Sequence, residues 1–69
     1  MDRTPVTSSN VAEVGYDSPS MTLEVLFLNG TLYQYFDIPE ILHQELIQSD
    51  SIGRFLNSNI KNNYRYTKL

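Results

Sequence analysis

The sequence predicts an α+β fold, a small antiparallel sheet with two short helices packed on one face, in the order β-β-β-α-α-β. Three observations lead to this prediction. Apolar residues alternate along 21–28, an Asn-Gly pair follows directly, and two later segments carry apolar residues at helical spacing. With 69 residues the chain forms one domain, which we place at 6–69, and residues 1–5 are expected to be disordered.

Three strands are predicted before the helices. Residues 10–17 suggest a short irregular strand, in which Gly15 marks either a bulge or a close approach of another segment. Residues 21–28 have the β-branched and aromatic content of a strand. The Asn-Gly pair at residues 29–30 predicts a tight hairpin turn, so residues 31–38 return as the third strand.

The register of this hairpin decides whether Tyr33 and Tyr35 face the core. A two-residue loop places them beside Glu24, whereas a three-residue loop with Gly30 in the left-handed conformation pairs Val25 with Tyr33. We favour the three-residue loop, because it collects the apolar residues of the hairpin on one surface. The two tyrosines are then core residues with hydroxyls at the rim, and the alternatives left open are a stacking platform and an oligomer interface.

Two helices and a last strand follow the hairpin. Pro39 suits the first turn of a helix, where its missing N–H is not needed. The apolar stripe of this helix consists of Ile41, Leu42 and Leu46. The candidate caps of the second helix are Ser49, Asp50 and Ser51, and its apolar stripe consists of Ile52, Phe55, Leu56 and Ile60. The Asn pair at 62–63 ends this helix, and residues 64–69 form a strand with Tyr64 and Tyr66 on one face.

The composition limits the classes of function. Because the chain has no cysteine, disulfides and thiolate metal sites are excluded, and a reducing cytoplasm is the expected location. His43 is the only histidine and there is no glycine-rich phosphate loop, so we expect no enzyme, no cofactor and no metal site. The apolar runs are too short to span a membrane, and no membrane partner is expected.

Charge is distributed unevenly along the chain. Residues 1–50 contain all eight acidic residues and one basic residue, a net charge of −7, whereas residues 51–69 contain four basic residues and no acidic one. The overall charge of −3 argues against non-specific duplex binding, but a local basic patch remains. The candidate phosphate-binding residues are Arg54, Lys61, Arg65 and Lys68, with Ser51 and Gly53 at a helix start where backbone N–H groups are free. The candidate stacking residues are Tyr33, Tyr35, Tyr64 and Tyr66. The alternative for Ser51 is an ordinary helix cap.

Three segments together are similar to one known family. They are VTSSNVAEVGYD, LEVLFLNGTLYQYFDIP and DSIGRFLNSNIKNNYRY, and they extend over about residues 6–68. At their centre, Tyr33-Gln34-Tyr35 resembles the Y-x-Y signature of the KTSC domain family, named for its occurrence at the C-terminus of some lysyl-tRNA synthetases. The other similar positions are Gly15-Tyr16-Asp17, Ile38-Pro39, Ser51-x-Gly53, Phe55-Leu56-Asn57 and Tyr64.

This resemblance implies an α+β domain without enzymatic activity, which also occurs as single-domain bacterial and phage proteins and for which RNA binding has been proposed. Our leading hypothesis is a non-enzymatic module that binds RNA, single-stranded DNA or a nucleotide. One alternative is a protein-interaction or inhibitor module, phage-encoded and acting on a host protein, and another is an oligomeric nucleotide sink. We expect a homo-oligomer, a dimer or larger. The acidic residues that would serve the inhibitor are Asp17, Glu24, Asp37 and Glu40.

Overall fold

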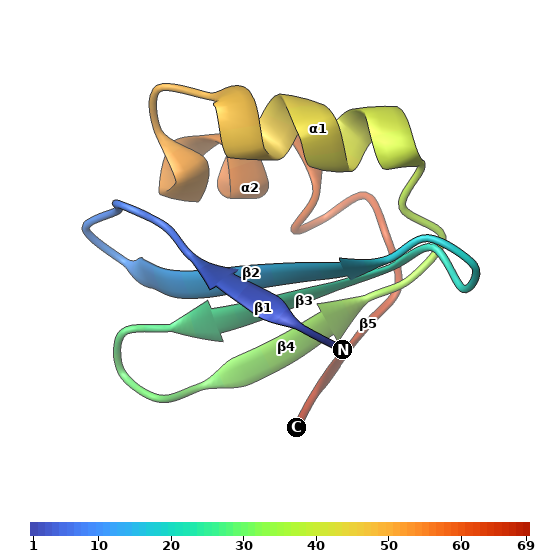
Figure 1. The fold of residues 1–69 in the computed structure, drawn as a ribbon, viewed down its shortest axis with the longest axis horizontal. Coiled ribbons are helices and arrows are strands. Elements are labelled where there is room, and N and C mark those ends of the chain that lie inside the picture. The colour runs from blue at the N-terminus through green and yellow to red at the C-terminus, as the bar shows by residue number, and fades with distance from the viewer.

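The computed structural model describes residues 1–69 and shows a five-stranded antiparallel sheet with two helices on one face (Figure 1). The elements are β1 (Arg3–Pro5), β2 (Val11–Asp17), β3 (Thr22–Phe27), β4 (Leu32–Tyr35), α1 (Glu40–Gln48), α2 (Ile52–Asn59) and β5 (Tyr66–Lys68). The strands lie in the sheet in their order along the chain, so β1 and β5 form its two edges. The predicted class and order of elements are confirmed, with β1 as an additional strand. Neither helix has the length and apolar character that crossing a membrane requires.

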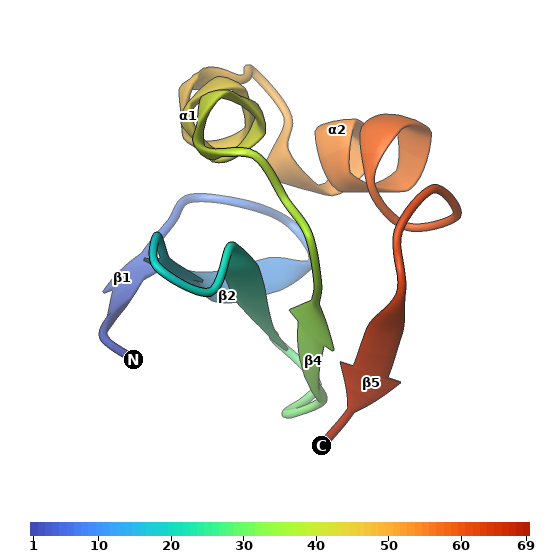
Figure 2. The ribbon, with the colours of Figure 1, turned by 90° about the vertical axis from the view of Figure 1, so that its right-hand side faces the viewer.

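The core lies between the sheet and the helices, which Figure 2 shows on the same side of the strands. Its buried members are Val11, Val14, Leu23, Val25, Tyr35, Ile38, Leu46, Ile52, Leu56 and Ile60. In β3 the core residues alternate and in α2 they lie about one turn apart, as the two periodicities require. The opposite face of the sheet carries no helix.

The hairpin between β3 and β4 has the register of the three-residue loop. Leu23 pairs with Tyr35 and Val25 pairs with Tyr33, while Gly30 has a φ of +90°. A residue with a Cβ is strained at that angle, which is why glycine occupies the end of the loop. Leu23, Val25 and Tyr35 are all buried in the core, so the predicted register is confirmed.

Both predicted helices form, and the structure identifies the cap of α2 and the buried stripe of α1. Ser51 caps α2, because its Oγ accepts a hydrogen bond from the backbone N–H of Arg54 at 3.3 Å. This is the ordinary cap that the sequence left open as an alternative. In α1, Leu46 is buried but Ile41 is 62 % exposed. Ile41 lies about 100° around the helix from Leu42, and the stripe that faces the sheet is centred on the latter and Leu46.

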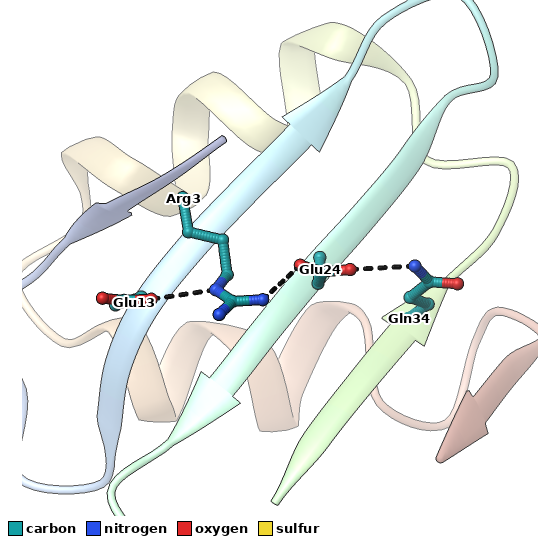
Figure 3. Close-up of polar contacts among 4 residues, drawn as sticks. All are labelled: Arg3, Glu13, Glu24 and Gln34. Atoms are coloured by element: carbon teal, nitrogen blue, oxygen red, sulfur yellow. Dashed lines mark hydrogen bonds and ion pairs between the residues drawn. The ribbon is translucent and has the colours of Figure 1, made fainter. Parts of the chain in front are cut away.

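The N-terminal segment differs from the expectation of disorder, since Arg3–Pro5 pair with β2. The side chain of Arg3 secures this strand by donating to Glu13 Oε1 at 2.8 Å and to Glu24 Oε2 at 2.5 Å (Figure 3). Glu24 also accepts from Gln34 Nε2 at 2.9 Å, which extends the polar row across four strands. These contacts join residues far apart in the sequence, so no local periodicity predicts the strand.

Gly15 makes the space for this contact. It pairs with Arg3 in the sheet, and a Cβ at this position would lie 2.7 Å from the backbone oxygen of Asp2 and 3.0 Å from Arg3 Cγ. Of the two predicted roles, Gly15 therefore has that of the close approach. The irregular register of β2 lies elsewhere, between Val11 and Glu13.

Candidate functional site

Four aromatic rings from β3, β4 and β5 form a cluster on the face of the sheet that carries the helices. Tyr33 is its centre, because its ring centroid lies 5.6 Å from that of Phe27, 6.1 Å from Tyr35 and 5.8 Å from Tyr66. Tyr35 and Tyr66 pair across β4 and β5 with centroids 5.9 Å apart. Tilted and edge-to-face pairs at such distances are the favourable arrangement of aromatic rings.

The tyrosines differ in exposure, and so in what they can do. Tyr35 is 2 % exposed and Tyr66 is 58 % exposed, with Tyr33 half-buried between them. Burial, together with the neighbouring Tyr33 and Tyr66 phenols, raises the pKa of Tyr35. Tyr64 precedes β5, is partly buried and packs against the core rather than beside these rings. Of these tyrosines, a ligand can therefore reach Tyr66 and part of Tyr33.

Two lysines converge on this cluster. Lys68 lies opposite Tyr33 in the β4–β5 pairing, and side chains on paired residues share a face. Lys61 directly follows the buried Ile60 at the end of α2, and its backbone N–H donates to the carbonyl of Leu56 at 2.9 Å. The end of the helix thus fixes one cation, and the pairing of β5 fixes the other.

The rings and the lysines line a groove made of two adjoining hollows. The larger hollow measures about 290 Å³ and is lined by Phe27, Asn29, Thr31, Tyr33, Tyr35, Lys61 and Lys68. The smaller measures about 70 Å³ and is lined by Tyr33, Tyr35, Lys61, Asn62 and Tyr66. We call the two together the aromatic–lysine groove. No carboxylate lines either hollow, so the lysine charges are not neutralised within the groove.

The two arginines of the predicted basic patch lie outside the groove. Arg65 points to the other face of the sheet, where Nη2 donates to Asp37 Oδ2 at 2.8 Å and the guanidinium lies 5.6 Å from the centre of the Phe36 ring. Alternation in β5 explains this, because Tyr66 and Lys68 share one face and Arg65 takes the opposite one. Arg54 lines a separate hollow of about 290 Å³ at the start of α2.

The start of α2 does not belong to the groove either. Arg54 shares its hollow with Asp50 and Ser51, and the Oγ of Ser51 is engaged as the cap. At Gly53, a Cβ would lie 3.5 Å from Asn10 Nδ2, so the helix start packs beside the loop that precedes β2. Of the ten predicted site residues, the structure brings together Lys61, Lys68, Tyr33, Tyr35 and Tyr66.

Sequence reasoning missed four residues that line the groove: Phe27, Asn29, Thr31 and Asn62. The sequence assigned Asn29 only to the turn and the Asn pair at 62–63 only to the end of a helix. Both assignments are compatible with a place at the rim of the groove. The signal that would have found them is the pairing of β5 with β4, which brings Tyr66–Lys68 and the segment before it beside the hairpin.

The acidic residues of the alternative hypothesis do not form one exposed face. Glu24 is 7 % exposed and lies between Arg3 and Gln34 (Figure 3). The hydrogen bond from Gln34, with that from Arg3, lowers the pKa of Glu24 although burial opposes the shift. Asp37 is paired with Arg65, so two of these four acids already have cationic partners.

A second aromatic contact connects the sheet to α1. The rings of Tyr16 and His43 stack with centroids 4.6 Å apart and planes 8° apart, and the Tyr16 hydroxyl donates to the carbonyl of Ile38 at 2.6 Å. Burial lowers the pKa of His43, although the nearby Glu40 opposes the shift. This histidine is a packed residue whose charged form is disfavoured in the folded state.

Comparison with known proteins places this fold in a family. The KTSC domain matches residues 7–64. This chain belongs to the KTSC domain family. A crystal structure of a KTSC domain protein from Yersinia pestis agrees with it at a TM-score of 0.95 and 37 % sequence identity, over 99 % of this chain and 96 % of that one. The resemblance expected from the sequence is thereby confirmed.

Two other relatives show how KTSC domains occur. An uncharacterized protein from Stutzerimonas stutzeri is 39 % identical over 70 residues, which cover 100 % of this chain and 99 % of that protein. A lysine–tRNA ligase from Trichormus variabilis is 33 % identical over 61 residues, which cover 88 % of this chain but 11 % of the ligase. The KTSC match contains Tyr33, Tyr35 and Lys61, whereas Tyr66 and Lys68 follow its last residue.

Proposed function

We propose that this KTSC domain is a non-enzymatic, cytoplasmic module that binds single-stranded nucleic acid in the aromatic–lysine groove. One observation supports the proposal above all: Lys61 and Lys68 converge on Tyr33 and Tyr66 in a groove without a carboxylate. Lysine ammonium groups neutralise phosphates, and an exposed phenol ring offers a face on which any base can stack.

A single strand fits this groove better than a duplex does. Stacking on Tyr66 requires a base that is free of its own neighbours, and a duplex hides its base faces. The chain also has a net charge of −3 and only two cations in the groove, far fewer than non-specific duplex binding uses. The ligand is therefore held by a short contact in which rings contribute as much as charge.

The KTSC relatives give independent support. The domain occurs within lysine–tRNA ligases, enzymes whose name states that they act on a tRNA. In the Trichormus variabilis ligase the similar region is 11 % of the protein, as expected of a small accessory module. A nucleic-acid ligand for the present chain agrees with that setting.

The test is a binding titration by fluorescence anisotropy, with a labelled oligouridylate of about ten nucleotides at low salt. Lys61→Gln should weaken binding and lower the slope of log K against log salt by about 0.7, the value for one phosphate on a single strand. Lys68→Gln should do the same.

The matched control is Arg54→Gln, which removes one charge from the first turn of α2, whereas Lys61 follows the other end of that helix. It should leave the salt slope unchanged, because Arg54 lies outside the groove. Equal slopes for Lys61→Gln and Arg54→Gln, or no binding by the unaltered chain at low salt, would refute the proposal.

A protein partner is the second candidate function, and the edge of the sheet favours it. All three residues of β5 are exposed, and the side of β5 away from β4 leaves backbone groups unpaired. An extended partner segment, or β5 of a second copy, would add a strand there. The other edge is less suited, because Pro5 in β1 has no N–H to donate. Sedimentation of a monomer at all concentrations would exclude the second copy, and with it an oligomeric nucleotide sink.

A further inference from the structure

We infer that the aromatic–lysine groove holds two consecutive nucleotides, with the phosphate that joins them at Lys61. This inference rests on the proposed function and specifies its ligand. It follows from the division of the groove into two hollows that share Tyr33, Tyr35 and Lys61.

Each hollow has the side chains that recognition of one nucleotide requires. The larger adds the Phe27 ring and Asn29, and the smaller adds the Tyr66 ring and Asn62. An aromatic face stacks on a base, and an asparagine amide can both donate to and accept from a base edge. The Oδ1 of Asn29 already accepts from the backbone N–H of Thr31 at 2.9 Å, which leaves its NH₂ group free to donate.

The two lysines of the groove are also arranged for two nucleotides. Lys61 lines both hollows, so it is the lysine placed to meet a linkage between two nucleotides. Lys68 lines only the larger hollow and is available to a second phosphate, on the nucleotide bound there. Two bases and two phosphates therefore correspond to two lysines and to the two rings that each line one hollow alone, Phe27 and Tyr66.

The sizes of the hollows also indicate a site for two nucleotides. A volume of about 290 Å³ lies at the lower limit of roughly 300 Å³ for sites that enclose a small ligand, enough for one nucleotide. The smaller hollow, about 70 Å³, admits part of a base stacked on Tyr66, with the rest of that nucleotide in solvent. Neither hollow is large enough for two nucleotides, so a dinucleotide has to occupy both.

The test is a length series measured by calorimetry at low salt with the complete chain. The probes are uridine monophosphate, the 5′-phosphorylated uridine dinucleotide, and oligouridylates of three, four and about ten nucleotides. The dinucleotide should bind at least about tenfold more tightly than the mononucleotide, because a second base stacks and a second phosphate is neutralised. Longer oligonucleotides should each add less than about threefold, since the groove has no third hollow for another base.

Two variants connect this series to the geometry. Tyr66→Ala should reduce the affinity for the dinucleotide about tenfold and leave that for the mononucleotide unchanged, because only the second base stacks on this ring. Asn62→Ala should also weaken the dinucleotide relative to the mononucleotide, but by a smaller factor than Tyr66→Ala does. Thermal unfolding of each variant verifies that the domain is folded.

The outcomes separate the two proposals. Mononucleotide and dinucleotide binding of equal strength, or an affinity that rises steadily up to ten nucleotides, would overturn the two-nucleotide site and leave nucleic-acid binding intact. If neither the ten-nucleotide strand nor any shorter probe binds, the proposed function itself fails. A Tyr66→Ala variant that loses both ligands equally would also overturn the inference, because it would place a single base on that ring.

Discussion

Replacing Gly15 with alanine is the substitution whose effect follows most directly from the geometry of the sheet. The new Cβ would lie 2.7 Å from the backbone oxygen of Asp2, so β1 would have to move by about 0.7 Å to reach an ordinary contact of 3.4 Å. Such a shift strains the pairing of β1 with β2 and the contact of Arg3 with Glu24. Overpacking of this kind costs about 1–3 kcal/mol.

That cost is large for this domain. A single core of this size supplies a net stability of roughly 3–5 kcal/mol. With an m value near 1 kcal/mol/M, the urea midpoint followed by circular dichroism should fall by about 1–3 M. The slope should stay nearly constant, because the same core unfolds.

The control for Gly15→Ala is the same substitution in a chain that lacks residues 1–5. Without Asp2 and Arg3 the three atoms nearest to the new Cβ are gone, so alanine should be neutral or stabilise by about 0.5–1 kcal/mol, as it does relative to glycine within a strand. Gly15 does not have a positive φ, so its backbone accepts alanine. Equal destabilisation in both chains, or none in the full chain, would refute the close-approach explanation.

The remaining predictions concern pH and the aromatic rings. Burial lowers the pKa of His43 below 6.5, so as pH falls the unfolded chain takes up this proton before the folded one does. The free energy of unfolding should therefore fall as pH decreases below about 6.5. In urea titrations at a series of pH values, His43→Gln should remove this loss of stability. The lowered pKa of Glu24 should add a separate loss of stability below about pH 4.5, which Glu24→Gln should abolish. Tyr16→Phe should destabilise by about 1 kcal/mol, because it removes the hydrogen bond to Ile38 but keeps the stacked ring; an unchanged urea midpoint would contradict this. Tyr66→Phe should keep oligouridylate affinity in the anisotropy titration, whereas Tyr66→Ala should weaken it about tenfold, and equal losses would mean that the hydroxyl matters rather than the ring.

The register of the hairpin was predictable because local chemistry and global packing require the same arrangement there. Gly30 is the residue that accepts a positive φ, and the alternation of β3 and β4 buries Val25 and Tyr35 only in one register. The β1 strand was not predictable, since its attachment comes from one long side chain that crosses Gly15 to reach Glu24. Periodicity reports which face of an element is buried, and it contains no information about such a contact.

The structure brings only two of the four predicted cations together, for a geometric reason. Four cations within residues 51–69 are close in sequence, but a helix and a strand intervene and distribute them. Arg54 lies in the first turn of α2, whereas Lys61 follows its C-cap, Ile60, so the length of the helix separates them. Arg65 and Lys68 are three apart in an extended segment, which places them on opposite faces. Charge counts from sequence therefore overestimated the number of cations in one site.

The position of Arg65 suggests how the groove is held together. β5 is a three-residue edge strand with all its side chains exposed, yet it supplies both Tyr66 and Lys68. Backbone bonds to β4 and the contacts of the Tyr66 ring with Tyr33 and Tyr35 hold it on the sheet. From the opposite face, Arg65 adds its contacts with Asp37 and the Phe36 ring. An exposed ion pair contributes little, at most about 1 kcal/mol. Binding and the docking of β5 are thus linked: a ligand that contacts Tyr66 and Lys68 must also stabilise the strand that carries them, and hydrogen exchange of the β5 amides should slow when the ligand is added.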